Sequence, residues 1–279
     1  MEKIRRNERL AILSKWLSDA PYQTYTLSQF CNKFNASKST MSEDIELLSD
    51  MYKRYRLGTI ETIAGASGGV RYVPSMPWKE AYDFLFSLSN ELSTQSRLLP
   101  GGFLYLTDIL NDPVAVSKMG AIIAQTYAHE APDFILTMET KGIPVALVTA
   151  KTLNIPLVVA RRAGTVYEGS AVNINYLSAS AGKVETMCLS RRAVKEGQRT
   201  LIVDDFIKGG CTAKGMADLM HEFSTTVVGS AFVIASEQPD NKMIQNDKAL
   251  MVMQNDENNN IIVKPSQWLT SLMEEEEKV

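Results

Sequence analysis

The stretch that most constrains the fold of this 279-residue chain is Leu201–Gly215, LIVDDFIKGGCTAKG. Aliphatic residues lead into two adjacent acids, Asp204 and Asp205, then into a Lys-Gly-Gly turn and the amphipathic run Ala213–Phe223. This order predicts a buried strand, a tight turn and the N-terminus of a helix. Such a turn presents free backbone N–H groups at the positive end of a helix dipole, so we expect it to bind an anion.

The acid pair narrows the type of ligand. Carboxylates repel a bare phosphate, so they suit a ligand that carries hydroxyl groups as well as phosphate, or a bridging Mg²⁺. A ribose phosphate fits, with its ring hydroxyls on Asp204 and Asp205 and its 5-phosphate on the amides from Lys208 to Thr212. The alternative is a plain strand–turn–helix of a doubly wound sheet, in which glycine only permits the turn. We favour the ligand site, because an acid pair at a strand end has no packing role.

From Asp133 onward, predicted strands alternate with helices, which is typical of an α/β fold with a mostly parallel sheet. Such a sheet binds ligands at the carboxyl ends of its strands. The turn Glu139–Ile143 lies between a strand and its helix, so it is expected to face the same crevice as the acid pair, although alone it is equally a plain turn. The predicted strands are Phe134–Met138, Leu157–Ala160, Val172–Leu177 with Val184–Leu189 as an antiparallel pair, Thr200–Val203, Val227–Ile234, Leu250–Met253 and Ile261–Val263.

The N-terminal part of the chain has a different pattern. Apolar residues at helical spacing predict helices within Glu2–Leu17, over Leu27–Phe34 and from Ser37 onward. Two alternating strands with a glycine-rich connection then predict a β-hairpin, Thr59–Ile63 and Val70–Val73. Helices followed by a hairpin are the pattern of a winged helix-turn-helix, whose recognition helix would begin in the Ser-Lys-Ser-Thr segment.

The charge of this part favours a polyanionic partner. Residues 1–74 carry 11 basic and 8 acidic residues, a net charge of +3, whereas the remainder carries −6. Arg5, Arg6, Lys38 and Arg71 have no obvious partner along the sequence, so we predict phosphate contacts by these groups. The alternative is a small helical cap that does not bind DNA, since hydroxyl residues at a helix start also stabilise the helix simply by capping it. The residues expected to reach base edges are Lys38, Ser39, Thr40 and Ser42.

Pro74–Pro77 ends the hairpin and predicts a boundary between a domain of residues 1–74 and a second of residues 75–279. Within the second domain, a helix is expected to begin at Asp112-Pro113. The chain's 3 cysteines are widely spaced and its 2 histidines are few, which predicts reduced thiols, a cytoplasmic protein and no metal-ligand set. No apolar run approaches membrane-spanning length, and the charged N-terminus lacks a signal-peptide pattern. We identify no catalytic residue.

The acid-pair stretch resembles the loop of type I phosphoribosyltransferases that binds phosphoribosyl pyrophosphate (PRPP), usually written Asp-Asp-x-x-x-Thr-Gly-Gly-Thr. This chain keeps both acids, Gly210 and the closing Thr212, whereas Gly209 replaces the first Thr and Cys211 the second Gly. The resemblance implies that PRPP binds here, together with Mg²⁺, and that the turn near Lys141 holds the pyrophosphate. The implied effector-binding residues are Asp204, Asp205, Phe206, Lys208, Gly209, Gly210, Cys211, Thr212, Thr140, Lys141 and Gly142.

The whole chain is similar to the purine operon repressors of Gram-positive bacteria. The matching segments are the Ser37 turn, Ala64–Val70, the Leu-Leu-Pro-Gly-Gly stretch from Leu98 and the loop Asp204–Thr212. The similarity implies a winged-helix domain on a phosphoribosyltransferase-like effector domain. It further implies a homodimer that binds operators of purine genes, responds to PRPP and has no transferase activity.

Three points about function stay open at this stage. Purine nucleotides, including ppGpp, are expected to compete with PRPP at the same site. In some lactic-acid bacteria the same type of protein activates transcription, so the sign of regulation is not fixed. The chain could also be an active purine phosphoribosyltransferase with an accessory domain, although the altered loop and the absence of a nameable base-recognition residue favour a regulator.

Overall fold

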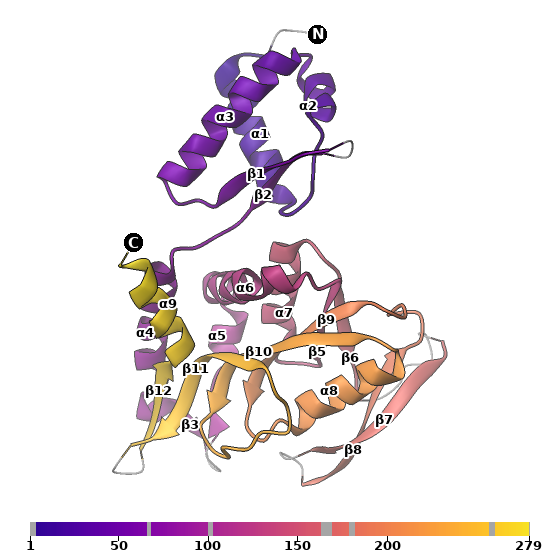
Figure 1. Cartoon of the computed structure of the whole chain (residues 1–279). Helices are drawn as coiled ribbons and strands as arrows, with labels where there is room; N and C mark the ends of the chain where they lie inside the picture. The colour runs from indigo at the N-terminus through magenta and orange to yellow at the C-terminus, as the bar shows by residue number, and fades with distance from the viewer. Residues whose placement is uncertain are drawn as a thin grey trace. The chain divides into compact units, whose positions relative to one another are not determined.

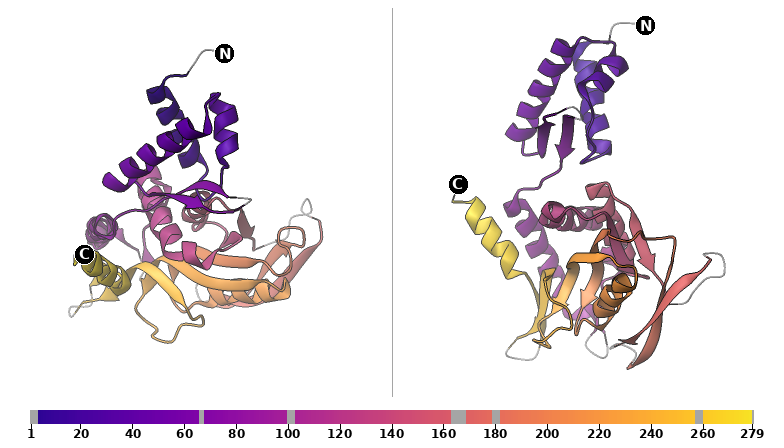
Figure 2. Two further views of the ribbon diagram at one scale, coloured as in Figure 1. Left: turned by 45° about the horizontal axis from the view of Figure 1, so that its top comes forward. Right: turned by 45° about the vertical axis from the view of Figure 1, so that its right-hand side comes forward.

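The computed structural model describes residues 4–65, 68–99, 103–162, 169–178, 182–256 and 260–278. The chain divides between Pro77 and Trp78 into two compact units (Figures 1 and 2). Each unit is a separate body with its own core. The predicted boundary between residues 74 and 75 stays a prediction. Residues 66–67 of the expected wing tip and residues 100–102 of the Leu-Leu-Pro-Gly-Gly stretch lie outside the described residues.

The first unit has the predicted helices followed by an antiparallel hairpin, which confirms the winged-helix-like fold (Figure 1). Local signals set the helix ends. Thr26 caps the second helix in a capping box with Gln29, and Ser37 caps the third by accepting from the Thr40 N–H. The elements are α1 Arg6–Asp19, α2 Leu27–Phe34, α3 Lys38–Arg54, β1 Thr59–Ile63 and β2 Gly69–Val73.

The core of this unit joins the helices to the hairpin. Tyr25 and Val70 exchange backbone hydrogen bonds of 2.9 Å in both directions, which fixes β2 against the segment before α2. Each fully buried aliphatic or aromatic side chain contributes about 1.5–3 kcal/mol relative to exposure. The buried side chains come from every element and include Leu13, Leu17, Phe30, Phe34, Met41, Ile45, Leu48, Ile60 and Val70.

The second unit is an α/β domain around a six-stranded sheet in the order β12-β11-β10-β9-β5-β6 (Figures 1 and 2). The neighbouring strands are parallel except β11 and β12, which confirms the predicted mostly parallel sheet. The strands are β3 Leu98–Leu99, β4 Phe103–Leu104, β5 Phe134–Met138, β6 Leu157–Ala160, β7 Ala171–Ser178, β8 Lys183–Ser190, β9 Arg199–Ile207, β10 Thr226–Ser236, β11 Asp247–Asn255 and β12 Ile261–Pro265. The helices are α4 Trp78–Leu92, η1 Gln95–Arg97, α5 Thr107–Asn111, α6 Pro113–Tyr127, η2 Ala128–Glu130, α7 Ile143–Leu153, α8 Cys211–Glu222 and α9 Gln267–Glu276.

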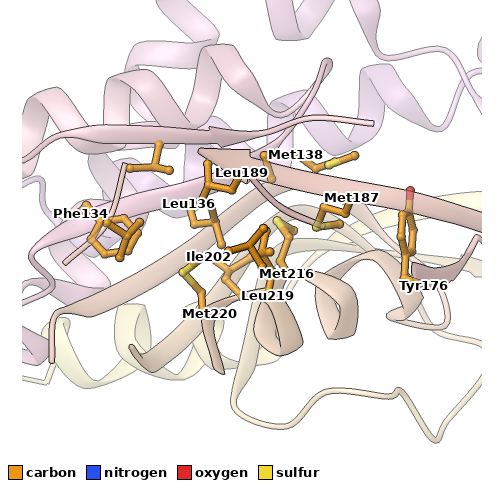
Figure 3. Close-up of a cluster of buried hydrophobic side chains, with 14 residues drawn as sticks. Phe134, Leu136, Met138, Tyr176, Met187, Leu189, Ile202, Met216, Leu219 and Met220 are labelled. Atoms are coloured by element: carbon orange, nitrogen blue, oxygen red, sulfur yellow. The ribbon is translucent and has the colours of Figure 1, made fainter. Parts of the chain in front are cut away.

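Helix α8 is held against the sheet by an apolar cluster. Figure 3 shows Met216, Leu219 and Met220 of this helix beside Leu136 and Ile202 of the sheet. The β7–β8 hairpin packs on the same helix. It comes close at Gly215, where a Cβ would lie only 3.0 Å from Tyr176 Cβ. This packing fixes the N-terminus of α8, and therefore the turn before it.

Two predicted boundaries were wrong. Strand β9 does not end before the acid pair but continues to Ile207, because its ladder with β10 pairs Asp204 with Phe232 and Ile207 with Ala235. Helix α8 runs from Cys211 to Glu222, whereas the predicted amphipathic run was Ala213–Phe223. Helix α4 ends at Leu92, where the Ser93 and Thr94 hydroxyls donate to the carbonyls of Ser89 and Glu91.

Candidate functional site

The acid pair lines a cavity of about 440 Å³ at the carboxyl edge of the sheet. It lies where β9 and β5 run out into the turns before α8 and α7, so the fold brings together two segments more than 60 residues apart. The predicted residues in its lining are Thr140, Lys141, Asp204, Asp205, Phe206, Lys208 and Thr212. The other lining residues are Leu104, Leu106, Met138, Glu139, Arg162 and Met253.

Asp204 is 8% exposed and has no salt bridge within the described part of the chain. Its Oδ1 accepts a hydrogen bond of 3.0 Å from the Asp205 backbone N–H. Burial raises the pKa of Asp204 well above its ordinary value, and the neighbouring Asp205 raises it further, while Arg162 acts in the opposite direction. A buried carboxyl without a cation is costly in the free protein, which is typical of a group kept for a ligand.

The turn after β5 is pressed against this carboxyl. A Cβ on Gly142 would lie 2.0 Å from Asp204 Oδ1, so only glycine allows the two segments to meet. Gly142 is therefore placed behind Asp204 rather than in the cavity lining. The Glu139–Thr140 peptide bond is cis, and Glu139 Oε1 accepts from the Arg162 N–H at 2.7 Å. This contact ties the turn to the end of β6.

The turn Lys208–Thr212, called the α8 turn below, forms an adjoining hollow of about 150 Å³. Gly209, Gly210 and Cys211 line this hollow together with Asp204 and Phe206. Gly210 precedes the helix with φ of 82°, a conformation that glycine adopts at no steric cost, and no side chain caps the helix N-terminus. The N–H groups of the first helical turn are thus placed to bind an anion. Outside the turn, the Met243 N–H donates to Gly209 O at 3.0 Å and holds its shape.

In the first unit, the predicted base-reading residues cluster at the N-terminus of α3. Lys38, Ser39 and Ser42 are exposed, and Thr40 is half-buried. The Ser37 hydroxyl lies 2.9 Å from those of Ser39 and Thr40. The segment therefore presents a hydroxyl-rich helix N-terminus with one lysine. Arg5 is also exposed, at the residue before α1.

The prediction that Arg6 and Arg71 lack partners was wrong. Arg6 Nε lies 3.0 Å from Asp44, and Arg71 Nε lies 2.8 Å from Glu61 across the β1–β2 hairpin. Asp44 is 38 residues from Arg6 in the sequence, so no local pattern indicated the pair. Cross-strand pairing of Glu61 with Arg71 follows from the hairpin register.

Sequence reasoning also missed an acidic surface on α3. Ser39, Glu46 and Asp50 follow each other at i, i+7 and i+11 and lie on one exposed face, with Glu43 beside them. Acids along this face repel phosphate, so the face favours DNA only at its N-terminal turn. A helical-wheel count of the exposed positions would have found this signal.

The missed residues of the cavity have different origins. Arg162 stands in one of the basic segments that flank the β7–β8 hairpin in the sequence, and it lines the cavity. Lys183, Arg191 and Arg192 are exposed and lie outside its lining. Leu104, Leu106 and Met253 had no chemical signal in the sequence, because apolar residues become a binding surface only through the fold.

Three negative findings apply to the described residues alone. They contain no group of three or more His, Cys, Asp or Glu side chains that could hold a metal ion. None of their helices combines the length and the apolar character needed to cross a bilayer. Cys31, Cys188 and Cys211 form no disulfide with one another.

Comparison with known proteins assigns both units to families. Residues 5–74 match the family model of the bacterial purine repressor N-terminal domain, and residues 106–267 match the phosphoribosyl transferase domain. The purine biosynthesis transcriptional repressor PurR of Bacillus subtilis is 38% identical over 251 residues, which are 90% of this chain and 88% of that protein. The chain belongs to the bacterial purine repressor family.

Members of this family include proteins named repressors and proteins named activators. The purine biosynthesis transcriptional activator PurR of Lactococcus lactis is 36% identical over 248 residues, 89% of this chain and 92% of that protein. Among solved structures, the adenine phosphoribosyltransferase of Saccharomyces cerevisiae aligns with a TM-score of 0.50 and 19% identity, covering 58% of this chain and 98% of the yeast chain. This likeness confirms the phosphoribosyltransferase fold of the second unit.

Proposed function

We propose that this chain is a DNA-binding regulator of purine biosynthesis genes whose second unit binds PRPP as effector. One observation carries the proposal: a purine-repressor N-terminal domain and a cavity lined by a carboxylate pair and an uncapped helix N-terminus occur in the same chain. We favour a repressor over an activator, because the repressor is the more similar of the two relatives described above.

The cavity supports PRPP in a defined orientation. The ribose hydroxyls donate to Asp204 and Asp205, whose ionised carboxylates accept hydrogen bonds and donate none. The 5-phosphate binds the N–H groups of the α8 turn, with Lys208 beside it. Lys141 and Arg162, which follow β5 and β6, also line the cavity and suit the pyrophosphate. Mg²⁺ fits as a companion of the pyrophosphate, because it binds through one or two carboxylates together with phosphates, and Asp205 supplies such a group.

An apolar part of the same cavity supports competition by purine nucleotides, including ppGpp. Leu104, Leu106 and Met253 are buried side chains in its lining, and Phe206 adds an aromatic ring. A flat base gains from contact with apolar and aromatic groups of this kind. No described side chain in this part offers a base-specific hydrogen bond besides the groups assigned to PRPP. We infer that the base adds affinity and that the phosphates direct the ligand.

The composition of this apolar part also supports a protein without transferase activity. A transferase must hold its base for attack at the ribose, and the apolar part of the cavity has no charged or amide group to orient one. The alternative is an active purine phosphoribosyltransferase. Product formation from PRPP with adenine, guanine, hypoxanthine or xanthine, measured beside a known transferase, decides between them.

The first unit is proposed to bind double-stranded operator DNA through the N-terminal turn of α3. Lys38, Ser39, Thr40 and Ser42 meet the bases, and Arg5 meets a phosphate, whereas Arg6 and Arg71 must leave their acids first. Operators with two half-sites require two such units at fixed spacing, so we propose a homodimer. We place the protein in the cytoplasm, where its free thiols stay reduced. The domains are proposed to span residues 1–74 and 75–279.

The double variant Asp204→Ala plus Asp205→Ala tests the effector site. It removes both hydroxyl acceptors and is expected to abolish the response of operator binding to PRPP, while operator affinity without PRPP stays at the parent level. Gel shifts and calorimetric titration with PRPP and Mg²⁺ measure the two quantities. A double variant that responds to PRPP like the parent contradicts the assignment of these acids.

A further inference from the structure

Thr137 carries a polar atom that the fold leaves without a partner. The residue is 0% exposed in the middle of β5, and its Oγ1 forms no hydrogen bond with any described residue. Buried hydroxyls in native proteins are almost always paired, because an unpaired one costs about 1–3 kcal/mol. Other buried threonines of the same unit follow that rule, since Thr149 Oγ1 donates to Val145 O at 2.9 Å and Thr200 Oγ1 to Phe134 O at 3.2 Å.

The unpaired hydroxyl lies next to the acid pair. The position of a Cβ on Gly142 would be 2.8 Å from Thr137 Oγ1 and 2.0 Å from Asp204 Oδ1. Both oxygens therefore lie close to the same glycine. Gly142 is the spacer that keeps this region open, since any side chain there would fill it.

We propose that Thr137 is a positioning residue for the effector site, whose hydroxyl donates a hydrogen bond to the carboxylate of Asp204 when a ribose phosphate binds. The inference rests on the proposed function of the cavity. It explains why a buried hydroxyl is left unpaired in the free protein: its acceptor comes into place only when the ligand fixes the Asp204 side chain.

The surroundings of Asp204 leave a place for such a donor. Its Oδ1 accepts from the Asp205 backbone N–H at 3.0 Å, and it has no salt bridge to a described residue. The charged groups in the lining of the same cavity are Glu139, Lys141, Arg162, Asp205 and Lys208. The cations among them are proposed to bind the ligand phosphates, so a neutral donor behind Asp204 fixes its carboxylate without competing for the ligand. A hydrogen bond from a hydroxyl to a charged group is stronger than one between neutral groups.

The test is the isosteric variant Thr137→Val, with Thr137→Ser as the conservative variant that keeps the hydroxyl. Thr149→Val is the matched control, since it makes the same change at a threonine that is equally buried but bonded within α7. Binding of PRPP with Mg²⁺ is measured by calorimetry on the full chain, together with thermal unfolding of the free protein.

We expect Thr137→Val to weaken PRPP binding roughly 10- to 100-fold at neutral pH. Thr137→Ser should bind close to the parent, because it keeps the hydroxyl, and Thr149→Val should keep the parent affinity. The free Thr137→Val protein should melt no lower than the parent, since an apolar isostere removes an unpaired hydroxyl.

Two results overturn the inference while the proposed function stands. One is a Thr137→Val protein that binds PRPP like the parent. The other is a Thr137→Ser protein as weak as the valine variant, which would point to packing of the methyl group. If the parent itself fails to bind PRPP, the proposed function of the cavity fails first, and the inference falls with it.

Discussion

The two units each bury an aspartate, and the two acids are treated in opposite ways. In the first unit Asp44 is 1% exposed and is neutralised on both oxygens, by Arg9 Nε at 2.8 Å and Arg6 Nε at 3.0 Å. In the second unit Asp204 is 8% exposed, faces a second carboxylate and has no salt bridge to a described residue. One charge is satisfied by the fold, and the other is left unsatisfied.

The difference separates a structural charge from a binding charge. Asp44 joins α3 to α1, and Arg9 also donates to Ile4 O at 3.0 Å, so the network fixes the helices of the first unit in their relative positions. Asp204 joins nothing except the next backbone N–H. Burial without a partner destabilises a protein, so a fold retains such a group where a ligand supplies the partner.

The largest effect is expected from breaking the structural pair. Asp44→Ala leaves the guanidinium of Arg9, whose side chain is 10% exposed, buried without its acid, which costs about 3–5 kcal/mol. Amide hydrogen exchange of α1 to α3 in the full chain should rise accordingly, and operator binding should be lost with the fold of this unit. Arg6→Ala is the control, because its side chain is 54% exposed and Asp44 keeps Arg9. Equal exchange in the two variants would show that the buried Arg9–Asp44 pair stabilises the unit no more than the exposed Arg6–Asp44 pair does.

A smaller effect of opposite sign is expected at the unpaired acid. The folded pKa of Asp204 is raised above 3.8, so the folded protein binds this proton more tightly than the unfolded chain does. The stability contributed by that proton is complete below pH 3.8 and is lost as pH rises through the raised pKa. At pH 7 the group therefore destabilises the free protein. Asp204→Asn should raise the free energy of unfolding at pH 7 by about 1 kcal/mol while weakening PRPP binding.

The pH dependence checks this assignment. The stability difference between Asp204→Asn and the parent should shrink as pH falls toward 4, because the parent's carboxyl then carries its proton. Denaturant unfolding of the second unit, followed over pH 4–8, measures the difference at about half-unit steps of pH. Glu196→Gln, a change at an exposed acid, should alter neither stability nor PRPP binding. A lower stability of Asp204→Asn at pH 7 would mean that the carboxylate has a partner in solution.

The smallest effect is expected on the DNA side, where a free cation can be compared with a paired one. Lys38 has no ion-pair partner in the part of the chain that the structure describes, whereas Arg71 is bound to Glu61. Lys38→Ala should weaken operator binding and reduce the salt slope by about one unit. Arg71→Ala should do less, because Arg71 is already paired with Glu61 and must leave that acid before it can contact a phosphate. Gel shifts at several salt concentrations measure both, and a larger loss for Arg71→Ala would show that its pair opens on DNA.

Local signals in the sequence were sufficient for much of the fold. The strands Phe134–Met138 and Leu157–Ala160 were predicted with the bounds that β5 and β6 have, because a short apolar run between turn residues defines both ends. Helix α6 was predicted from Asp112 and Pro113, and Asp112 does accept from the Ala115 N–H at 2.7 Å. These features depend on hydrogen bonds and steric limits within a few residues.

The candidate site could be predicted only in its polar half. The acid pair and the glycine turn indicate a binding site from the sequence alone, whereas Leu104 and Met253 are ordinary apolar residues until the fold places them in one cavity. The end of β9 could not be predicted either. Its last residues are part of the strand only because they pair with β10. Residue type determined which groups could bind a ligand, and chain topology determined which of them meet.

The pairing of charges marks the limit most clearly. The sequence by itself determined that both units contain acids and bases, that an Asp-Asp pair precedes a glycine turn, and that helices and strands alternate as they do. Only the tertiary structure decided that Asp44 meets Arg6 and Arg9 while Asp204 meets no base in the described chain. Partners 35 and 38 residues apart are selected by the packing of helices against each other, and electrostatic energy depends on that distance and burial rather than on sequence.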